Sequence, residues 1–185
     1  GILDCLIAQS KGIDNVISLG GTSLNIKQLE LIKKYSPKRI TLCLDNDEAG
    51  KKATLKIIEL IRNTKIKLYI SNLPDGIKDP DQLIKEKGIE EFVSVINNSE
   101  SYYLYMLEEI TAPYREKDFY TDKERDEIID STYDLLVYLN DPIEKELFYS
   151  VLTTITNGKV TKEAVQYKTK KKNIKSQQYV TFNNI

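Results

Sequence analysis

Residues 40–50 read ITLCLDNDEAG, an unbroken apolar run that passes directly into an acidic turn. The run over residues 40–44 is typical of a fully buried β-strand. Asp45 and Asp47 lie two residues apart, so in extended backbone their side chains point to the same side. Two neighbouring carboxylates repel each other unless a cation lies between them. Because Mg²⁺ is a hard ion that prefers oxygen ligands, the turn is a candidate metal site.

The segments around this turn alternate between helix and strand patterns. Helices are predicted over residues 2–11, 26–35 and 48–63 and from residue 80 onward, and strands over 15–19, 39–44 and 67–70. This alternation is typical of a parallel α/β sheet. Binding sites in such sheets form outside the carboxyl ends of the strands. The residues that fall there, and that we expect to converge on one site, are Gly20–Ser23, Asp45, Asp47, Asp79 and Asp81.

The character of the chain changes after residue 98. Ten of the twelve tyrosines lie beyond this point, and the strand patterns end. Helices are predicted over residues 99–110, 121–139, 142–156 and 162–168, with capping signatures at Thr121 and Asp141. We therefore expect an α/β core over residues 1–98, a small helical bundle over 99–167 in which the tyrosines pack, and a basic tail over 168–185.

The charged residues are distributed unevenly, although the formal net charge is only −1. Residues 1–98 carry 15 Lys and Arg against 13 Asp and Glu, whereas residues 99–167 carry 7 against 15. The acidic helical part is a poor surface for a nucleic-acid strand, because phosphates dominate such binding. It is better suited to packing on the sheet or binding a protein partner. The tail over 168–185 carries five lysines and no acid, a pattern more typical of a solvated linker.

The composition excludes several kinds of chemistry. The chain has no histidine, which excludes histidine general bases and serine–histidine triads. Its two cysteines, Cys5 and Cys43, lie in apolar stretches without metal-ligand spacing, so we expect buried free thiols. No apolar run approaches the roughly 18 residues of a membrane span, and no signal peptide is visible. These features predict a cytoplasmic protein with no membrane partner.

Four segments occur in a specific order and spacing, although each is weak by itself. They are GILD at 1–4, SLGGTS at 18–23, LCLDNDEAG at 42–50 and LPDGIKDPD at 73–81. Together they resemble the TOPRIM core of bacterial-type replicative DNA primases. The segments GIEEF at 88–92 and DPIEK at 141–145 look like the helical part that closes the primase polymerase region. The resemblance implies a partial TOPRIM parallel sheet flanked by helices and followed by a small helical bundle.

This resemblance implies synthesis of RNA primers on single-stranded DNA by metal-dependent nucleotidyl transfer from ribonucleotides. Asp45 and Asp47 would be the catalytic carboxylates. The residues implied to hold Mg²⁺ or Mn²⁺ are Asp4, Asp45, Asp47, Asp79 and Asp81. The ions would bridge the phosphates of the incoming nucleotide and assist attack by a 3′-hydroxyl. Weaker matches that would contact phosphates are Gly21, Thr22 and Lys78. A replicative helicase is a further partner that the resemblance implies.

The sequence departs from the TOPRIM pattern in two places. Family members carry a glutamate directly before the glycine that matches Gly1, at the end of a first strand, and this sequence begins after it. The turn at Gly20–Ser23 has one glycine more than usual. We therefore expect a core that lacks its first strand, binds Mg²⁺ weakly and synthesises no primers by itself.

Two alternatives of different classes stay open. TOPRIM cores also occur in topoisomerases and in nucleases of the overcoming-lysogenisation-defect type, although no tyrosine here is placed as a topoisomerase nucleophile. The second alternative is a non-catalytic metal-binding or docking module, such as a phospho-acceptor receiver. A receiver carries a lone aspartate after its third strand and a lysine after its fifth, and the acids of this chain are arranged differently.

Overall fold

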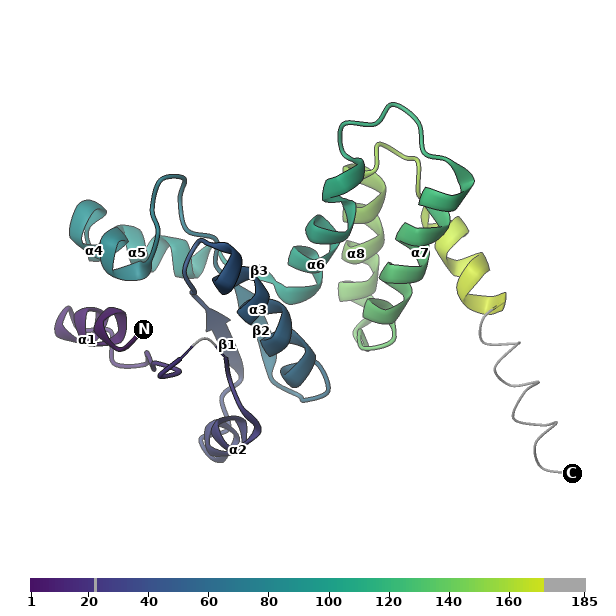
Figure 1. Ribbon diagram of the computed structural model, residues 1–185. Coiled ribbons are helices and arrows are strands. Elements are labelled where there is room, and N and C mark those ends of the chain that lie inside the picture. The colour runs from purple at the N-terminus through teal and green to yellow at the C-terminus, as the bar shows by residue number, and fades with distance from the viewer. Residues whose placement is uncertain (22, 172–185) are drawn as a thin grey trace, which may run out of the picture. The chain divides into compact units, whose positions relative to one another are not determined.

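The computed structural model describes residues 1–21 and 23–171 (Figure 1). Contacts between residues divide the chain into two compact units, one formed by residues 1–102 and the other beginning at Tyr103. The sequence predicted a division after residue 98. Thr22, a predicted phosphate contact, and most of the predicted basic tail lie outside the described residues.

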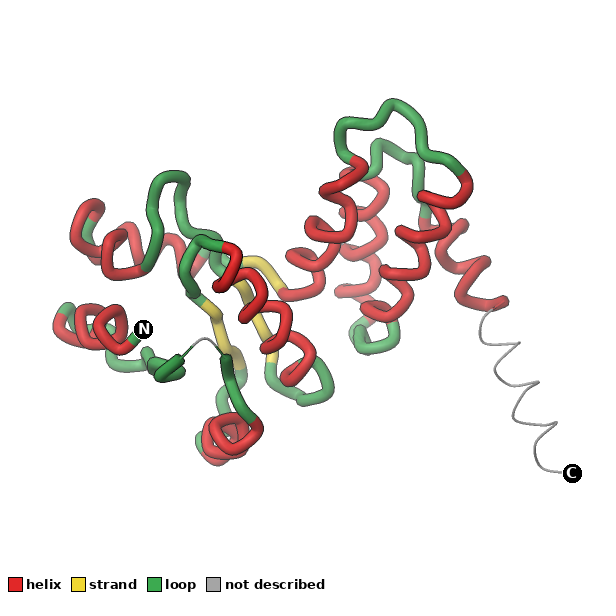
Figure 2. The backbone as a smooth tube through the Cα atoms, viewed as in Figure 1, coloured by secondary structure: helices red, strands yellow, loops and turns green. Residues whose placement is uncertain are grey.

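The first unit is a small sheet flanked by helices. Its elements are α1 (Ile2–Ser10), α2 (Ile26–Lys34), β1 (Arg39–Leu42), α3 (Glu48–Ile61), β2 (Lys67–Ile70), α4 (Pro80–Lys87), α5 (Ile89–Asn97) and β3 (Glu100–Ser101). The strands lie in the order β1-β2-β3, with β1 and β2 parallel and β3 antiparallel to β2. Figure 2 shows the three strands in yellow among the helices. The predicted α/β class is confirmed.

Alternation along the strands separates a buried face from a more open one. Leu68 and Ile70 of β2 are buried, whereas Lys67 is exposed and Tyr69 half-buried. Helix α3 contacts β2 and buries its own apolar stripe, which comprises Ala53, Ile57, Ile58 and Ile61. A second apolar cluster joins α1, α4 and α5 to the loop after β2, and its buried members are Ala8, Leu73, Ile77, Leu83, Ile84 and Phe92.

Three details of the predicted sheet are wrong. The run over residues 40–44, predicted as a fully buried strand, forms β1 only as far as Leu42, and Leu42 is the one buried residue of that strand. Residues 15–19, predicted as a strand, form no strand, although Val16 accepts hydrogen bonds from the side chains of Cys5 and Gln9 on α1. The segment therefore lies against α1. The sheet is also mixed and not wholly parallel, because the unpredicted two-residue strand β3 pairs Ser101 with Tyr69 in antiparallel register.

The second unit is helical. It comprises α6 (Tyr102–Thr111), the 3₁₀ turn η1 (Ala112–Tyr114), α7 (Asp122–Leu136), α8 (Pro142–Ile155) and a helix over residues 162–171. Tyr103 of α6 packs against Phe148 of α8, with ring centroids 6.4 Å apart. Its other fully buried apolar side chains include Leu107, Ile128, Leu152, Val160 and Val165. Among the described residues, no helix combines the length and apolar character that crossing a lipid bilayer requires.

A close backbone approach holds the turn between β1 and α3. Gly50, in the first turn of α3, is buried, and a Cβ added to it would lie 2.0 Å from the carbonyl oxygen of Asp45. The Gly50 carbonyl in turn accepts a hydrogen bond from Thr54 Oγ1 at 2.9 Å. Only glycine lets the chain leaving β1 pass this close to the start of α3.

Replacing Gly50 with alanine should destabilise the first unit by about 2 kcal/mol or more, because overpacking against backbone outweighs the better helix propensity of alanine. Lys52→Ala, at an exposed position of the same helix, is the matched control and should change stability by less than about 0.5 kcal/mol. Denaturant unfolding followed by circular dichroism measures both. A Gly50→Ala protein as stable as wild type would contradict the close approach.

The start of α7 should make the stability of the second unit depend on pH. Hydrogen bonds lower the pKa of Glu124 from 4.5 to about 2. The bond from Lys117 has the largest effect, and the bonds from Thr121 have the next largest. Since the pKa is depressed in the folded state, the stabilisation is fully present above pH 4.5 and is lost as the pH falls toward 2. Glu124→Gln keeps the capping geometry and removes the charge.

We therefore expect the variant to melt at a lower temperature than wild type at pH 7, with the difference shrinking steadily between pH 4.5 and pH 3. Thermal melts in that range measure it. A difference as large at pH 3 as at pH 7 would show that the Glu124 charge is not what stabilises the helix.

Candidate functional site

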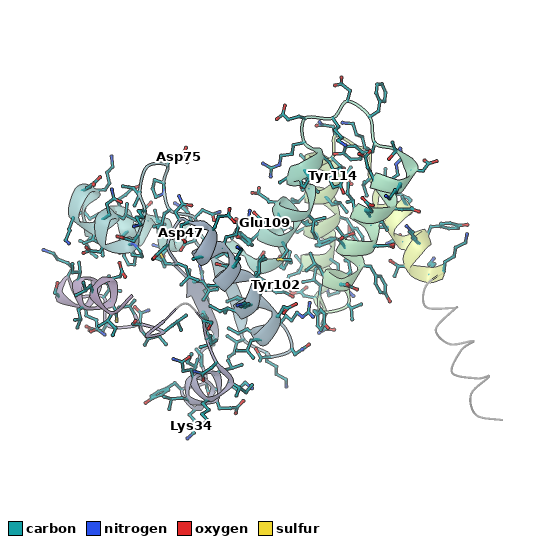
Figure 3. The ribbon with its side chains drawn as sticks, in the orientation of Figure 1. Lys34, Asp47, Asp75, Tyr102, Glu109 and Tyr114 are labelled. Atoms are coloured by element: carbon teal, nitrogen blue, oxygen red, sulfur yellow. The ribbon has the colours of Figure 1, made fainter. Side chains whose placement is uncertain are left out.

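The acidic turn lies at the carboxyl end of β1 and leads straight into α3. Asp47 is the N-cap of this helix, and its Oδ1 accepts a hydrogen bond from the Gly50 amide at 2.7 Å. This position places the side chain at the end of the helix where backbone amides without partners inside the helix are available as hydrogen-bond donors. Asp45 precedes it and stays exposed. Figure 3 shows Asp47 at the start of α3.

A second pair of carboxylates belongs to the start of α4. Asp79 is the N-cap, and its Oδ1 accepts a hydrogen bond from the Gln82 amide at 2.7 Å. Pro80 occupies the first helical position, as the sequence predicted. Asp81 lies one residue further on and is paired through Oδ2 with Lys85. The two pairs of acids thus follow the same scheme, with one member of each pair capping a helix.

A backbone hydrogen bond joins the two acidic segments. The Asn46 amide donates to the Lys78 carbonyl at 2.7 Å, so the turn after β1 is held against the loop that precedes α4. The Lys78 amide donates to Gln82 Oε1 at 2.8 Å, which fixes this loop on the first turn of α4. Asn46 and Gln82 therefore position the carboxylates. From the sequence, neither Asn46 nor Gln82 was assigned a role in the site.

Asp4 brings α1 into the same site. Its Oδ1 accepts a hydrogen bond from the Asp81 amide at 3.0 Å, across 77 positions of sequence. Its Oδ2 contacts the Gly1 amino group. Within the described chain, the remaining Asp81 oxygen, Oδ1, is buried and accepts no hydrogen bond. A buried carboxylate oxygen without a donor is costly, which marks it as a position that a cation or a bound donor would stabilise.

The pKa of Asp45 depends on the same group of acids. Desolvation is the largest effect that raises the pKa of Asp45, even though the residue as a whole is exposed. The Gly1 amino group opposes this effect, while the charges of Asp4, Asp47 and Asp79 raise the pKa further. Three of the other predicted metal-binding carboxylates therefore act on Asp45, and the last one, Asp81, is hydrogen-bonded to Asp4 through its amide.

The donor chemistry fits a hard divalent cation, because carboxylate oxygens are the ligands that Mg²⁺ and Mn²⁺ prefer. Among the described residues, no three acidic or cysteine side chains are arranged closely enough to hold an ion as they stand. Mg²⁺ does not require such a cage, since it is usually held by one or two carboxylates together with water and substrate phosphates. The arrangement is compatible with an open site.

The predicted phosphate contacts are less well placed. Lys78 is exposed and lies in the loop held against the acidic turn. Gly21 is exposed in the loop before α2, and a Cβ added to it would meet no atom within 4 Å. This loop is tied to α2 through the side chain of Gln28, which donates to the Leu19 carbonyl at 2.8 Å. No contact described for Gly21 links it to the acidic residues.

The cysteines take no part in the site chemistry. Cys5 and Cys43 are free and partly buried. Burial is the main effect that raises the pKa of Cys43 to about 11, so this thiol stays protonated near neutral pH. Next to it, buried Ser71 anchors the end of β1 by donating from both its amide and its hydroxyl to the Leu42 carbonyl. No sequence pattern indicated this role of Ser71.

Comparison with known proteins finds similarity to Toprim-like domains and to DNA primases. Residues 1–84 match the family described as Toprim-like. The DNA primase of Clostridium acetobutylicum is 30% identical over 160 residues, which cover 84% of this chain and 25% of the primase. The DNA primase of Aquifex aeolicus is 39% identical over 99 residues, covering 54% of this chain and 20% of the primase. The chain thus spans about a quarter or less of the length of these curated relatives.

Solved structures show the same fold. The zinc-binding and RNA polymerase domains of the Aquifex aeolicus primase match with a TM-score of 0.62 and 28% identity, over 89% of this chain and 37% of that one. A DNA primase domain from Pseudomonas aeruginosa matches with a TM-score of 0.67 and 22% identity, over 91% of this chain and 52% of that one. Residues 1–84 therefore match the Toprim-like family, and most of the chain is similar to one region of bacterial DNA primases.

Proposed function

We propose that this chain is the metal-binding part of a primase, which makes RNA primers by nucleotidyl transfer on a single-stranded DNA template. The observation that carries the proposal is the joining of two capped acidic segments, Asp45–Asp47 and Asp79–Asp81, by the Asn46–Lys78 backbone hydrogen bond of 2.7 Å. Homology to primases supports the reaction class. A related primase catalytic domain has been solved bound to single-stranded DNA, which supports the template.

Each carboxylate has a distinct part in this proposal. Asp45 and Asp47 hold Mg²⁺ or Mn²⁺, and Asp79, Asp81 and Asp4 complete the acidic surroundings. A bound divalent ion supplies neutralisation of the charge that develops on the transferred phosphate. Asp47 and Asp79 each use one oxygen as a helix cap, which fixes the orientation of the other oxygen. Such fixed, preorganised charges are the usual source of electrostatic rate enhancement.

The loop that carries Lys78 is suited to substrate phosphates. The Lys78 side chain is exposed beside the acidic segments. Hydrogen bonds hold the Lys78 backbone at both its amide and its carbonyl. A lysine on a fixed backbone provides a mobile positive charge for a nucleotide phosphate. Gly21 and Thr22 complete the proposed phosphate contacts. A helicase partner would be bound by the helical part, as the sequence suggests.

The double variant Asp45→Asn plus Asp47→Asn should weaken Mg²⁺ or Mn²⁺ binding by about tenfold or more, because two negative charges are removed from the ion's surroundings. Asparagine also caps helices well, so α3 should stay intact. Asp14→Asn plus Asp118→Asn removes the same charge from exposed positions outside the site and is the matched control. Calorimetric titration with Mg²⁺, or paramagnetic resonance with Mn²⁺, measures the affinity.

Thermal melts provide a second readout. Without divalent ions, Asp45→Asn should melt at the same temperature as wild type or higher, because repulsion from Asp4, Asp47 and Asp79 is relieved. Adding Mg²⁺ should raise the melting temperature of wild type more than that of the variant. Equal metal affinity in the wild type and the double variant would exclude Asp45 and Asp47 as the metal site.

We expect this chain alone to synthesise no primers, because it matches only about a quarter of the length of the primases to which it is homologous. Primer synthesis on a single-stranded DNA template with radiolabelled ribonucleotides and Mg²⁺ tests this expectation. A primase catalytic domain serves as the positive control. Labelled primers made by this chain alone, and lost in the Asp45→Asn plus Asp47→Asn variant, would show that the site is complete within it.

A further inference from the structure

Two cation-rich segments meet in the first unit, at the end opposite the acidic site. Residues 31–44 and residues 60–74 contain lysines and arginines but no acid. The segments lie side by side, because the Lys67 amide donates to the Lys38 carbonyl at 3.2 Å and Arg39 is the register partner of Lys67. We call the exposed cations at this place the basic end: Lys34, Lys38, Arg39, Lys65 and Lys67.

The basic end lies opposite the acidic site. Because β1 and β2 are parallel, their amino ends lie together at one edge of the sheet and their carboxyl ends at the other. Figure 3 shows Lys34 at the far end of the unit from Asp47 and Asp75. Lys33, in the same segment, is paired with Glu30 at 2.8 Å. The unit therefore has a negative end and a positive end, and the positive end has no place in the proposed catalytic function.

Aromatic groups accompany these cations. Tyr35 ends α2 and is 81% exposed, and Ser36 after it adopts a positive φ of 49°, which turns the chain away. The guanidinium of Arg39 lies 3.9 Å from the centre of the Tyr69 ring, and its Nη2 donates to Ser99 Oγ at 2.5 Å. These contacts hold the guanidinium in place. Contact of an exposed aromatic ring with water is unfavourable. A ring among lysines suits a flat ligand that carries negative charge and can stack on it.

We propose that the basic end binds single-stranded nucleic acid. Lys34 and Lys38 contact backbone phosphates, and a base stacks on Tyr35. Phosphate contacts with lysine supply the affinity, and stacking on an aromatic ring tolerates any base, so the binding is independent of sequence. An acidic protein segment would satisfy the cations but would leave Tyr35 without a stacking partner. This site goes beyond the proposed catalytic function and does not depend on the metal site.

The first test is a charge reversal at the basic end. Lys34→Glu plus Lys38→Glu should weaken binding of a fluorescently labelled oligothymidylate at least tenfold at low salt. The slope of log affinity against log salt should fall by about 1.4, which is about 0.7 for each lost phosphate contact. Lys11→Glu plus Lys87→Glu makes the same change of charge at exposed positions outside the basic end and should have a much smaller effect. Fluorescence anisotropy measures all three proteins.

The second test concerns the ring. Tyr35→Ala should weaken binding roughly tenfold, and Tyr35→Phe should restore it, because stacking needs the ring and not the hydroxyl. An abasic oligonucleotide of the same length should bind wild type and Tyr35→Ala equally. Because Tyr35 is exposed, its replacement should leave the core intact. Circular dichroism checks that each variant is folded.

Three outcomes would overturn the proposal. They are equal weakening by the two charge reversals, no effect of Tyr35→Ala on oligothymidylate binding, and equal competition by an acidic peptide of matched length and charge. The Asp45→Asn plus Asp47→Asn variant separates this site from the catalytic proposal. It should bind oligothymidylate no more weakly than wild type while losing metal, whereas the variant at Lys34 and Lys38 should keep its metal affinity.

Discussion

The near-contact between the Asp45 carbonyl and the backbone of Gly50 is the constraint on which the site depends. A Cβ added to Gly50 would lie 2.0 Å from that carbonyl oxygen, so any side chain at this position would collide with it. The close turn lets Asp47 cap α3 directly after the strand. As a consequence, Asp45 and Asp47 follow β1 closely and lie at the start of α3, where the Gly50 amide orients the Asp47 carboxylate.

The acidic segments show how stability and chemistry share the same residues. Asp47 and Asp79 stabilise the helices that they cap, whereas desolvation, and after it the charges of Asp4, Asp47 and Asp79, raises the pKa of Asp45. The proposed cation site is therefore electrostatically unfavourable without a cation. The amino ends of β1 and β2 carry the opposite charge. Exposed lysines and an arginine lie there, and residues 31–44 and 60–74 contain no acid. The polarity of the parallel strands separates the two groups.

Most of the helices could be predicted because their starts are encoded locally. Thr121 and Asp141 cap the helices that the sequence assigned to them, Asn25 caps α2, and each uses its side chain to accept a hydrogen bond from a backbone amide. Strands were harder. Residues 15–19 have a strand-like pattern but lie against α1, and β3 has only two residues. A strand is defined by its hydrogen-bonding partner, which nearby residues do not encode.

Local sequence thus accounted for the α/β class of the first unit, the helical nature of the second and the identity of the acidic candidates, because periodicity, caps and charge are properties of short segments. The folded chain alone showed which groups meet. Asp4 reaches Asp81 across 77 positions, and Asn46 joins the turn to the loop at Lys78. Lys38 and Lys67 likewise become neighbours only through strand pairing. Such contacts depend on how helices and strands pack, since the backbone must return to the same place from distant points of the sequence.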